Sequence, residues 1–288
     1  MPVFTLAWGD HRLVLGERSR IMGIVNVTPD SFSDGGRFFD PEAAAAQGLR
    51  LVEEGADILD VGGESTRPFS DPVPAEEEIR RVVPVIRALA AQVRVPISVD
   101  TAKAKVAEAA LEAGAAIVND VSAGRMDPDL LPLAGRRGVP VILMHMKGTP
   151  KTMQKNPEYA DLIGEIQGFL ADARSRAEAA GVDPGRVILD PGVGFGKTFA
   201  HNLSILRRLD AFADLNAPLL VGASRKAFIR RLVREADGPE PAPDGPSVET
   251  GSQAAVSAAV LAGAHIVRVH DVARTRDTLR VIDAIRDA

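Results

Sequence analysis

The chain has 288 residues, of which 45% are hydrophobic and 25% are charged, and its formal net charge is -5. This balance is typical of a globular protein, and the length is sufficient for one large core. A mildly acidic chain with one Trp and one Tyr does not predict a nucleic-acid partner, which would need a basic face or stacking aromatics. An anionic small molecule remains open as a ligand, because a local basic patch can override the net charge.

The chain contains no cysteine, which excludes disulfides, thiolate nucleophiles and cysteine-based zinc sites. The first twenty residues lack the basic and apolar regions of a signal peptide. No apolar run approaches the length of about 20 residues that spans a bilayer. We therefore expect a cytoplasmic protein without a membrane partner.

Short apolar runs alternate with amphipathic helical segments along the chain. The runs cover residues 21–26, 57–62, 96–100, 116–120, 139–145, 186–190, 218–224 and 265–270. Helical periodicity is clearest at residues 41–55, 76–92, 101–114 and 251–264. Such alternation predicts a parallel sheet covered on both faces. About eight strand–helix units predict a TIM (β/α)8 barrel. The alternative, a doubly wound open sheet, usually has fewer strands and a nucleotide fingerprint after the first.

Residues 1–288 are predicted to form a single domain. Residues 1–20 precede the first strand–helix unit, and we expect them to form a small hairpin on the bottom of the barrel. Residues 234–249 are rich in Pro, Gly and acidic residues, which predicts a flexible surface loop.

Polar residues end almost every apolar run. In a TIM barrel these strand ends lie on one face, where active sites are built. The pattern therefore predicts a ring of donors and acceptors at the C-terminal face. Its members are Asn26, Asp60, Asp100, Asn119, His145, Asp190, Ser224, Arg268 and His270.

Several of these residues also have simpler, structural interpretations. Asp100 and Asn119 could cap the helices that follow them. Arg268 and His270 share one side of the last strand and suggest an anion site, although a lone histidine is more often structural. The motif "DPGVGFGKT", residues 190–198, lacks the P-loop spacing and leaves Asp190 followed by a glycine loop that holds Phe195 and Lys197.

Taken in order, these motifs resemble those of the dihydropteroate synthase family. The resemblance rests on "NVTPDSFSDGG", "GGESTRP", "SVDT", "IVND", "LMH", "DPGVGFGKT", "GASRK" and "RVHDV", and covers the chain from residue 21 to the C-terminus. It implies a TIM barrel that condenses 6-hydroxymethyl-7,8-dihydropterin pyrophosphate with 4-aminobenzoate. The products would be 7,8-dihydropteroate and pyrophosphate. Mg²⁺ as cofactor and a homodimer are implied as well.

The resemblance also implies roles for individual residues. Asp190 and Asn119 would bind the pterin edge, with Asp100 at the other ring nitrogens and Lys226 at the carbonyl side. Met144 would line the apolar slot. Arg268 would stack on the ring and reach the pyrophosphate, beside His270 and a metal-binding Asn26.

The same resemblance explains the long polar loop "VTPDSFSDGG" after the first strand. This loop and the one carrying Thr66, Arg67 and Pro68 would close over the site and form the 4-aminobenzoate pocket. Phe32, Pro68 and Phe195 would supply apolar walls, and Ser224 would receive the carboxylate.

The implied mechanism is dissociative: pyrophosphate leaves first, and the arylamine attacks the resulting pterin-methyl cation. The residues expected to be catalytic are Asp34, Arg67, Asp100, Lys226, Arg268 and His270. Phe69 replaces the glycine that usually follows Arg-Pro in the family, which puts the shape of the second loop in question. The alternatives are a pterin-binding methyltransferase domain and a non-catalytic paralogue; both would be expected to lack parts of this residue set.

Overall fold

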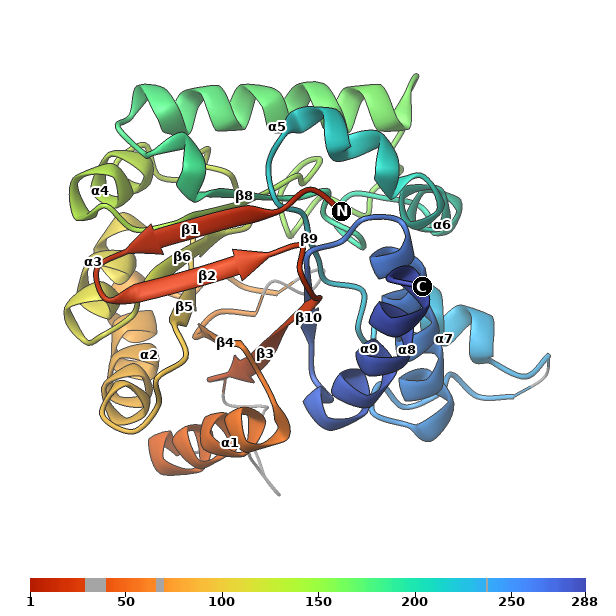
Figure 1. The fold of residues 1–288 in the computed structure, drawn as a ribbon, viewed down its shortest axis with the longest axis horizontal. Coiled ribbons are helices and arrows are strands. Elements are labelled where there is room, and N and C mark those ends of the chain that lie inside the picture. Colours follow the sequence, from red (N-terminus) through yellow and green to blue (C-terminus); the bar gives the residue numbers. More distant parts are fainter. Residues whose placement is uncertain (29–39, 66–69, 237) are drawn as a thin grey trace.

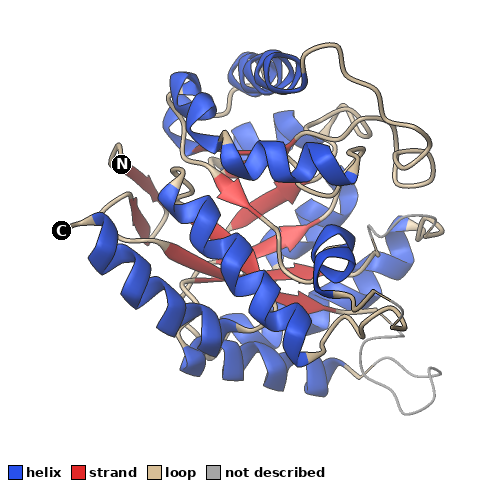
Figure 2. Ribbon diagram, turned by 90° about the vertical axis from the view of Figure 1, so that its right-hand side faces the viewer, coloured by secondary structure: helices blue, strands red, loops and turns tan. Residues whose placement is uncertain are grey.

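The fold is a closed barrel of parallel strands surrounded by helices (Figures 1 and 2). The structure is a computed structural model, and it describes residues 1–28, 40–65, 70–236 and 238–288. The barrel strands are β3 (Arg20–Asn26), β4 (Ile58–Gly62), β5 (Ile97–Asp100), β6 (Ile117–Asp120), β7 (Val141–Met144), β8 (Val187–Asp190), β9 (Leu220–Val221) and β10 (Ile266–Val269). The helices around them are α1 (Pro41–Glu54), α2 (Ala75–Ala90), α3 (Ala104–Glu112), α4 (Leu130–Arg137), α5 (Leu162–Ala179), α6 (Phe199–Arg207), α7 (Ala227–Val233), α8 (Pro246–Leu261) and α9 (Val272–Arg286).

The strand order confirms the TIM barrel. Neighbouring strands follow the order β8-β7-β6-β5-β4-β3-β10-β9. The two ends of this order meet at a parallel bridge between Leu189 and Leu219, and the Leu189 amide donates to the Pro218 carbonyl at 2.9 Å. Because the sheet closes on itself, the alternative of an open doubly wound sheet is wrong.

Helix α1 shows how the sequence defines an element. Asp40 accepts hydrogen bonds from the amides of Glu42 and Ala43, and Pro41 occupies the first helical position. The helix ends at Gly55, whose φ of 113° lies in the left-handed region. This is the glycine stop that the sequence predicts.

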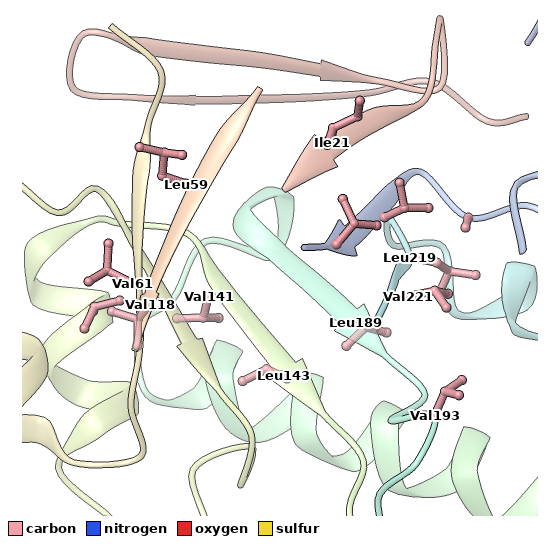
Figure 3. Close-up of a cluster of buried hydrophobic side chains, with 14 of the residues drawn as sticks. Ile21, Leu59, Val61, Val118, Val141, Leu143, Leu189, Val193, Leu219 and Val221 are labelled. Atoms are coloured by element: carbon pink, nitrogen blue, oxygen red, sulfur yellow. The ribbon is translucent and has the colours of Figure 1, made fainter. Parts of the chain in front are cut away.

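The strands alternate between two apolar layers. In β4, Leu59 and Val61 point outward into the core between barrel and helices, together with Val118, Leu143 and Leu189 of other strands (Figure 3). The alternate residue Ile58 belongs instead to the cluster inside the barrel. The period of two along each strand therefore separates an outer core from an inner one.

The N-terminal hairpin closes the bottom of the barrel, as predicted. Its strands β1 (Phe4–Trp8) and β2 (His11–Leu15) pair antiparallel and lie across the barrel end in Figure 1. Four of its side chains are buried against the inner cluster: Leu6, Trp8, Leu13 and Leu15. The residues they cover lie at the N-terminal ends of strands: Met22, Ile58, Ile117, Ile142, Ile188, Leu220 and Ile266.

The predicted surface loop at 234–249 is shorter than expected. Helix α8 begins at Pro246, so the last four residues of that segment are helical. Proline at the first helical position has the required φ and no amide to satisfy, and the composition of the segment concealed this start. Within the described residues, no helix is long and apolar enough to cross a membrane.

Candidate active site

The pairing of the strands sets four site positions in one row. Asn26 of β3 is opposite Gly62 of β4, Gly62 is opposite Asp100 of β5, and Asp100 is opposite Asn119 of β6. A Cβ atom on Gly62 would lie 3.3 Å from the Cβ of Asp100. Glycine at this position therefore leaves room for the Asp100 carboxylate.

Arg268, Asp60, Asp100 and Asn119 form one hydrogen-bonded network. The Arg268 Nε donates to Asp60 Oδ2 at 2.6 Å, and its Nη2 donates to Asp100 Oδ2 at 2.8 Å. Asn119 Nδ2 donates to the same Asp60 oxygen at 3.1 Å. Asp60 is fully buried, whereas Asp100 and Asn119 keep 8% and 5% of their surface exposed. Asp60 therefore lies behind the other two and orients Arg268 and Asn119.

The charges in this network are unequal, because one guanidinium serves two carboxylates. Burial is the main cause that raises the pKa of Asp100 to about 7; Arg268 lowers it, and the nearby charge of Asp60 raises it further. Burial lowers the pKa of Arg268, but Asp60 and Asp100 more than compensate and the net pKa is raised. Asp100 can therefore change its protonation state near neutral pH while Arg268 stays charged.

Asp190 ends β8 beside Met144 of β7. Its Oδ1 accepts a hydrogen bond from the Gly192 amide at 2.7 Å, and burial raises its pKa to about 6. Met144 packs in a small apolar cluster with Val121, Met146, Met153 and the partly buried Phe195. The arrangement places a carboxylate beside an apolar cluster, a combination that suits a flat heterocycle with hydrogen-bonding edges.

The glycine loop after Asp190 is fixed by a buried lysine. Lys197 is 2% exposed, and its Nζ lies 2.9 Å from His145 Nδ1 and donates to the Phe195 carbonyl at 2.9 Å. A Cβ on Gly192 would lie 1.9 Å from the His145 carbonyl oxygen, so only glycine fits this approach. Burial lowers the pKa of Lys197 to about 7, and it lowers the pKa of His145 far below its ordinary value.

The motif "GASRK" supplies two further polar groups. Lys226 Nζ lies 4.0 Å from the ring centroid of Phe195, a cation–π contact. Burial lowers the pKa of Lys226 to about 8, and Arg268 lowers it further while Asp190 and Asp100 raise it. Ser224 Oγ lies 3.1 Å from His270 Nδ1. These groups belong to the same electrostatic neighbourhood as the carboxylates.

Residues predicted for the site therefore lie together where the structure describes them. They are Asn26, Asp100, Asn119, Met144, Asp190, Phe195, Ser224, Lys226, Arg268 and His270. Asp34, Thr66, Arg67 and Pro68 lie outside the described residues, as do Phe32 and Phe69. For these loop residues the expectations stay predictions.

Two residues of the network were not assigned to the site from the sequence. Asp60 was included in the predicted ring of polar strand ends without a role of its own, but β4 continues to Gly62, so Asp60 sits within the strand and orients its neighbours. Lys197 was placed in the glycine loop after Asp190 but was given no role. A signal for Asp60 was available: it lies two residues after the inward-facing Ile58 and therefore faces inward.

The donors at the strand ends fit only a metal ion that takes one or two ligands from the protein. Asn26 is half-buried at the end of β3. The described residues contain no group of three or more His, Asp or Glu side chains that could hold a metal ion. Mg²⁺ often takes one or two protein ligands, with waters and substrate phosphates completing its octahedron, and a single asparagine is compatible with that mode.

The barrel and its C-terminal polar end define a class of enzyme. Residues 22–270 match the family model described as "Pterin binding enzyme". The chain is 44% identical over 270 residues to the dihydropteroate synthase of Synechocystis sp., with 94% of this chain and 91% of the relative covered. It is 45% identical over 269 residues to that of Escherichia coli K12, with 93% and 92% covered.

Solved structures agree with these matches. The Xanthomonas albilineans dihydropteroate synthase with 4-aminobenzoic acid is 48% identical, with a TM-score of 0.87 and 96% of each chain covered. The same enzyme with 7,8-dihydropteroate is 46% identical, with a TM-score of 0.84 and coverage of 96% and 97%. The Yersinia pestis enzyme with a sulfonamide drug is 41% identical, with a TM-score of 0.90 and coverage of 99% and 100%. The chain belongs to the dihydropteroate synthase family of pterin-binding enzymes.

Proposed function

We propose that this chain condenses 6-hydroxymethyl-7,8-dihydropterin pyrophosphate with 4-aminobenzoate to form 7,8-dihydropteroate and pyrophosphate in folate biosynthesis. The observation that carries the proposal is the set of Asp100, Asn119, Asp190 and Arg268 at one end of the barrel, with Met144 beside Asp190, in a chain of this family. A methyltransferase domain and a non-catalytic paralogue are less favoured, because the relatives matched over nearly the whole chain are synthases.

The pterin is recognised by its hydrogen-bonding edge. The Asp190 carboxylate accepts from ring N–H and amino groups, and the Asn119 amide both donates and accepts. Asp100 faces the other ring nitrogens, and Lys226 donates to the ring carbonyl. Met144 packs against the face of the ring. The residual exposure of Asp100, Asn119 and Asp190, between 5% and 8%, is consistent with side chains that contact a ligand.

The pyrophosphate end lies toward Arg268, His270 and Asn26. Arg268 is held by Asp60 and Asp100, so its guanidinium is oriented before substrate binds. Asn26 would hold Mg²⁺ there, and the metal would add positive charge to the departing pyrophosphate. His270 adds a ring nitrogen that can donate to a phosphate oxygen.

The bond between the pterin methylene carbon and the pyrophosphate oxygen breaks, and the electron pair leaves with pyrophosphate. The methylene cation that remains is stabilised by the pterin ring and by the carboxylates of Asp100 and Asp34. The amine of 4-aminobenzoate then forms the carbon–nitrogen bond and releases a proton to solvent. By the family resemblance, Arg67, Thr66 and Pro68 would contribute to the arylamine pocket with Phe195, and Ser224 would receive the carboxylate.

The assembly and location are part of the proposal. We infer a homodimer in the cytoplasm, in keeping with the family resemblance and the absence of cysteine. Sedimentation of the purified protein at micromolar concentration tests the dimer directly, and a single monomeric species would contradict it.

The test of the reaction is pyrophosphate release from the dihydropterin substrate and Mg²⁺, with and without 4-aminobenzoate. Release that depends on 4-aminobenzoate and matches dihydropteroate formation supports the synthase. Pterin binding without release under either condition would leave only a binding protein. A heavy-oxygen label in the bridging position tests the order of steps, because reversible cleavage scrambles the label before 4-aminobenzoate is added.

A further inference from the structure

One residue between two site side chains has an unusual backbone conformation. Arg225 lies between Ser224 and Lys226, and its φ is 59°. This left-handed region brings the Cβ of an L-residue close to the backbone, and glycine is the residue that adopts it freely. Strained residues of this kind persist only where their surroundings hold them, and they gather at functional sites.

Helix α8 supplies the groups that hold Arg225. The Arg225 amide donates to Ser252 Oγ at 3.0 Å, and its Nε forms a short ion pair with Glu249. Glu249 and Ser252 are three residues apart and therefore lie on one face of the helix. Both are buried, at 3% and 1% exposure. Backbone and side chain of Arg225 are thus both bound to the same helix.

The contact is more than a surface ion pair. Oε2 of Glu249 is buried and has no hydrogen-bond partner within the described residues, so the carboxylate depends on Arg225 for its compensation. Ser252 Oγ donates in turn to the Val248 carbonyl at 2.8 Å, which fixes the direction in which it accepts. Two buried polar groups are therefore committed to a residue that, in the proposed reaction, does not itself contact substrate.

The turn at Arg225 determines where its neighbours point. Ser224 lies against His270, and Lys226 reaches over the Phe195 ring. We infer that Glu249 and Ser252 are positioning residues, which hold the left-handed turn at Arg225 and so aim Ser224 and Lys226 at the two substrates. This inference rests on the proposed function, in which Lys226 contacts the pterin and Ser224 the 4-aminobenzoate carboxylate.

A comparison of glycine and alanine at position 225 tests the role of the turn. Both substitutions, Arg225→Gly and Arg225→Ala, are made in a Glu249→Ala background, so that no buried carboxylate is left without its partner. The two double variants lack the same ion pair and differ by one methyl group. Because only glycine enters the left-handed region without penalty, we expect kcat/KM for 4-aminobenzoate to be about tenfold lower in the alanine variant.

Further measurements separate positioning from stability. Melting temperatures are recorded for both double variants, and kinetics are measured where both are folded. Adding Arg225→Gly to Glu249→Ala should restore part of the kcat/KM that Glu249→Ala loses. Glu249→Gln keeps an acceptor for the Arg225 Nε, and we expect it to lose less activity than Glu249→Ala.

Equal kcat/KM in the glycine and alanine double variants, with an active wild type, would overturn the inference and leave the proposed function intact. A wild type that forms no dihydropteroate in the same assay would overturn the proposed function, and this inference with it.

Discussion

The two ends of the barrel use the same strands for opposite purposes. At the N-terminal end, inward-facing side chains are apolar and the hairpin covers them. Two residues further along the same strands, the inward-facing positions are mostly polar. The change from apolar to polar occurs in four pairs: Ile58 and Asp60, Ile117 and Asn119, Ile188 and Asp190, and Ile266 and Arg268. The partners of Met22, Ile142 and Leu220 are Ile24, Met144 and Gly222, which carry no polar side chain.

The distance between the two layers is about 7 Å, because each strand residue advances about 3.3 Å. Over this distance the interior of the barrel changes from a cluster of apolar side chains to a network of buried charges. The lower layer stabilises the fold through apolar burial. Burying the charges of the upper layer costs desolvation free energy. Ion pairs compensate this cost, and the central ones join Arg268 to Asp60 and Asp100. Substitutions in the two layers should therefore separate activity from stability.

The largest effect is expected for Arg268→Met. The variant removes the cation that faces the departing pyrophosphate in the proposed reaction, and it deprives Asp60 and Asp100 of their shared ion-pair partner. We expect kcat/KM for the dihydropterin substrate to fall about 10³-fold, as when a preorganised electrostatic group is lost. Arg280→Met is the matched control, because Arg280 is exposed and, among the described residues, forms an ion pair with Asp277 at the surface. A loss of less than about tenfold in Arg268→Met would contradict the role given to this residue.

Activity and stability should respond to pH in opposite directions. As pH rises toward 7, kcat/KM should increase, while the contribution of Asp100 to stability should decrease. In the proposed reaction Asp100 acts as a carboxylate, so kcat/KM should fall about tenfold per pH unit below its pKa of about 7. Since this pKa is raised above the ordinary 3.8, the folded state binds more protons than the unfolded state between these values. The contribution of Asp100 to stability therefore decreases as pH rises from about 4 to about 7.

The measurement is a pH profile of kcat/KM and of the midpoint of urea unfolding, for the wild type and Asp100→Asn. The variant should lose the limb near pH 7 in the residual activity. Its unfolding midpoint should also vary less with pH. An unchanged limb would assign the titration to another group, of which Asp190 is the first to test.

A smaller effect is expected for Lys197→Met, which sharpens the comparison within the upper layer. Lys197 holds the loop that carries Phe195 but is not expected to contact substrate. We expect an increase of about tenfold in KM for 4-aminobenzoate, as for a modest misplacement of the pocket wall. Removing a buried cation offsets the lost hydrogen bonds, so the melting temperature should change little. Lys105→Met, at an exposed ion pair, is the control, and equal KM values in both variants would refute the positioning role.

The smallest effect on activity is expected for Leu15→Ala in the lower layer. Leu15 is fully buried between the hairpin and the barrel. Its truncation should lower the free energy of unfolding by about 2–5 kcal/mol. Because the cavity lies at the opposite end from the chemistry, kcat/KM should stay within about twofold of the wild type. Urea unfolding and steady-state kinetics on the same preparation check both statements.

The fold was predictable from the sequence because its signals are local and repeated. Apolar runs alternating with helical periods give the barrel, and a glycine such as Gly55 marks a helix end. The start of α8 was missed, because Pro246 lies in a segment whose composition resembles a loop. The composition of a segment averages over several residues, whereas the position of a helix start depends on a single residue, here Pro246.

The site was predictable in its members but not in its connections. The polar strand ends pointed to Asp100, Asn119 and Asp190, and the family motifs supplied their roles. That Asp60 orients both Arg268 and Asn119 depends on the strand order, which places β10 two strands away from β4 on one side and β6 two strands away on the other. No local pattern in the sequence contains that order. The burial of Lys197 likewise depends on how the loop after β8 packs on the loop after β7.

The most direct test of this account is the initial rate of dihydropteroate formation by Arg268→Met and Leu15→Ala, measured side by side where both variants are folded. Arg268→Met should be nearly inactive, whereas Leu15→Ala, although less stable, should work at close to the wild-type rate. Comparable loss of activity in both variants would contradict the division between a catalytic end and a structural end of the barrel.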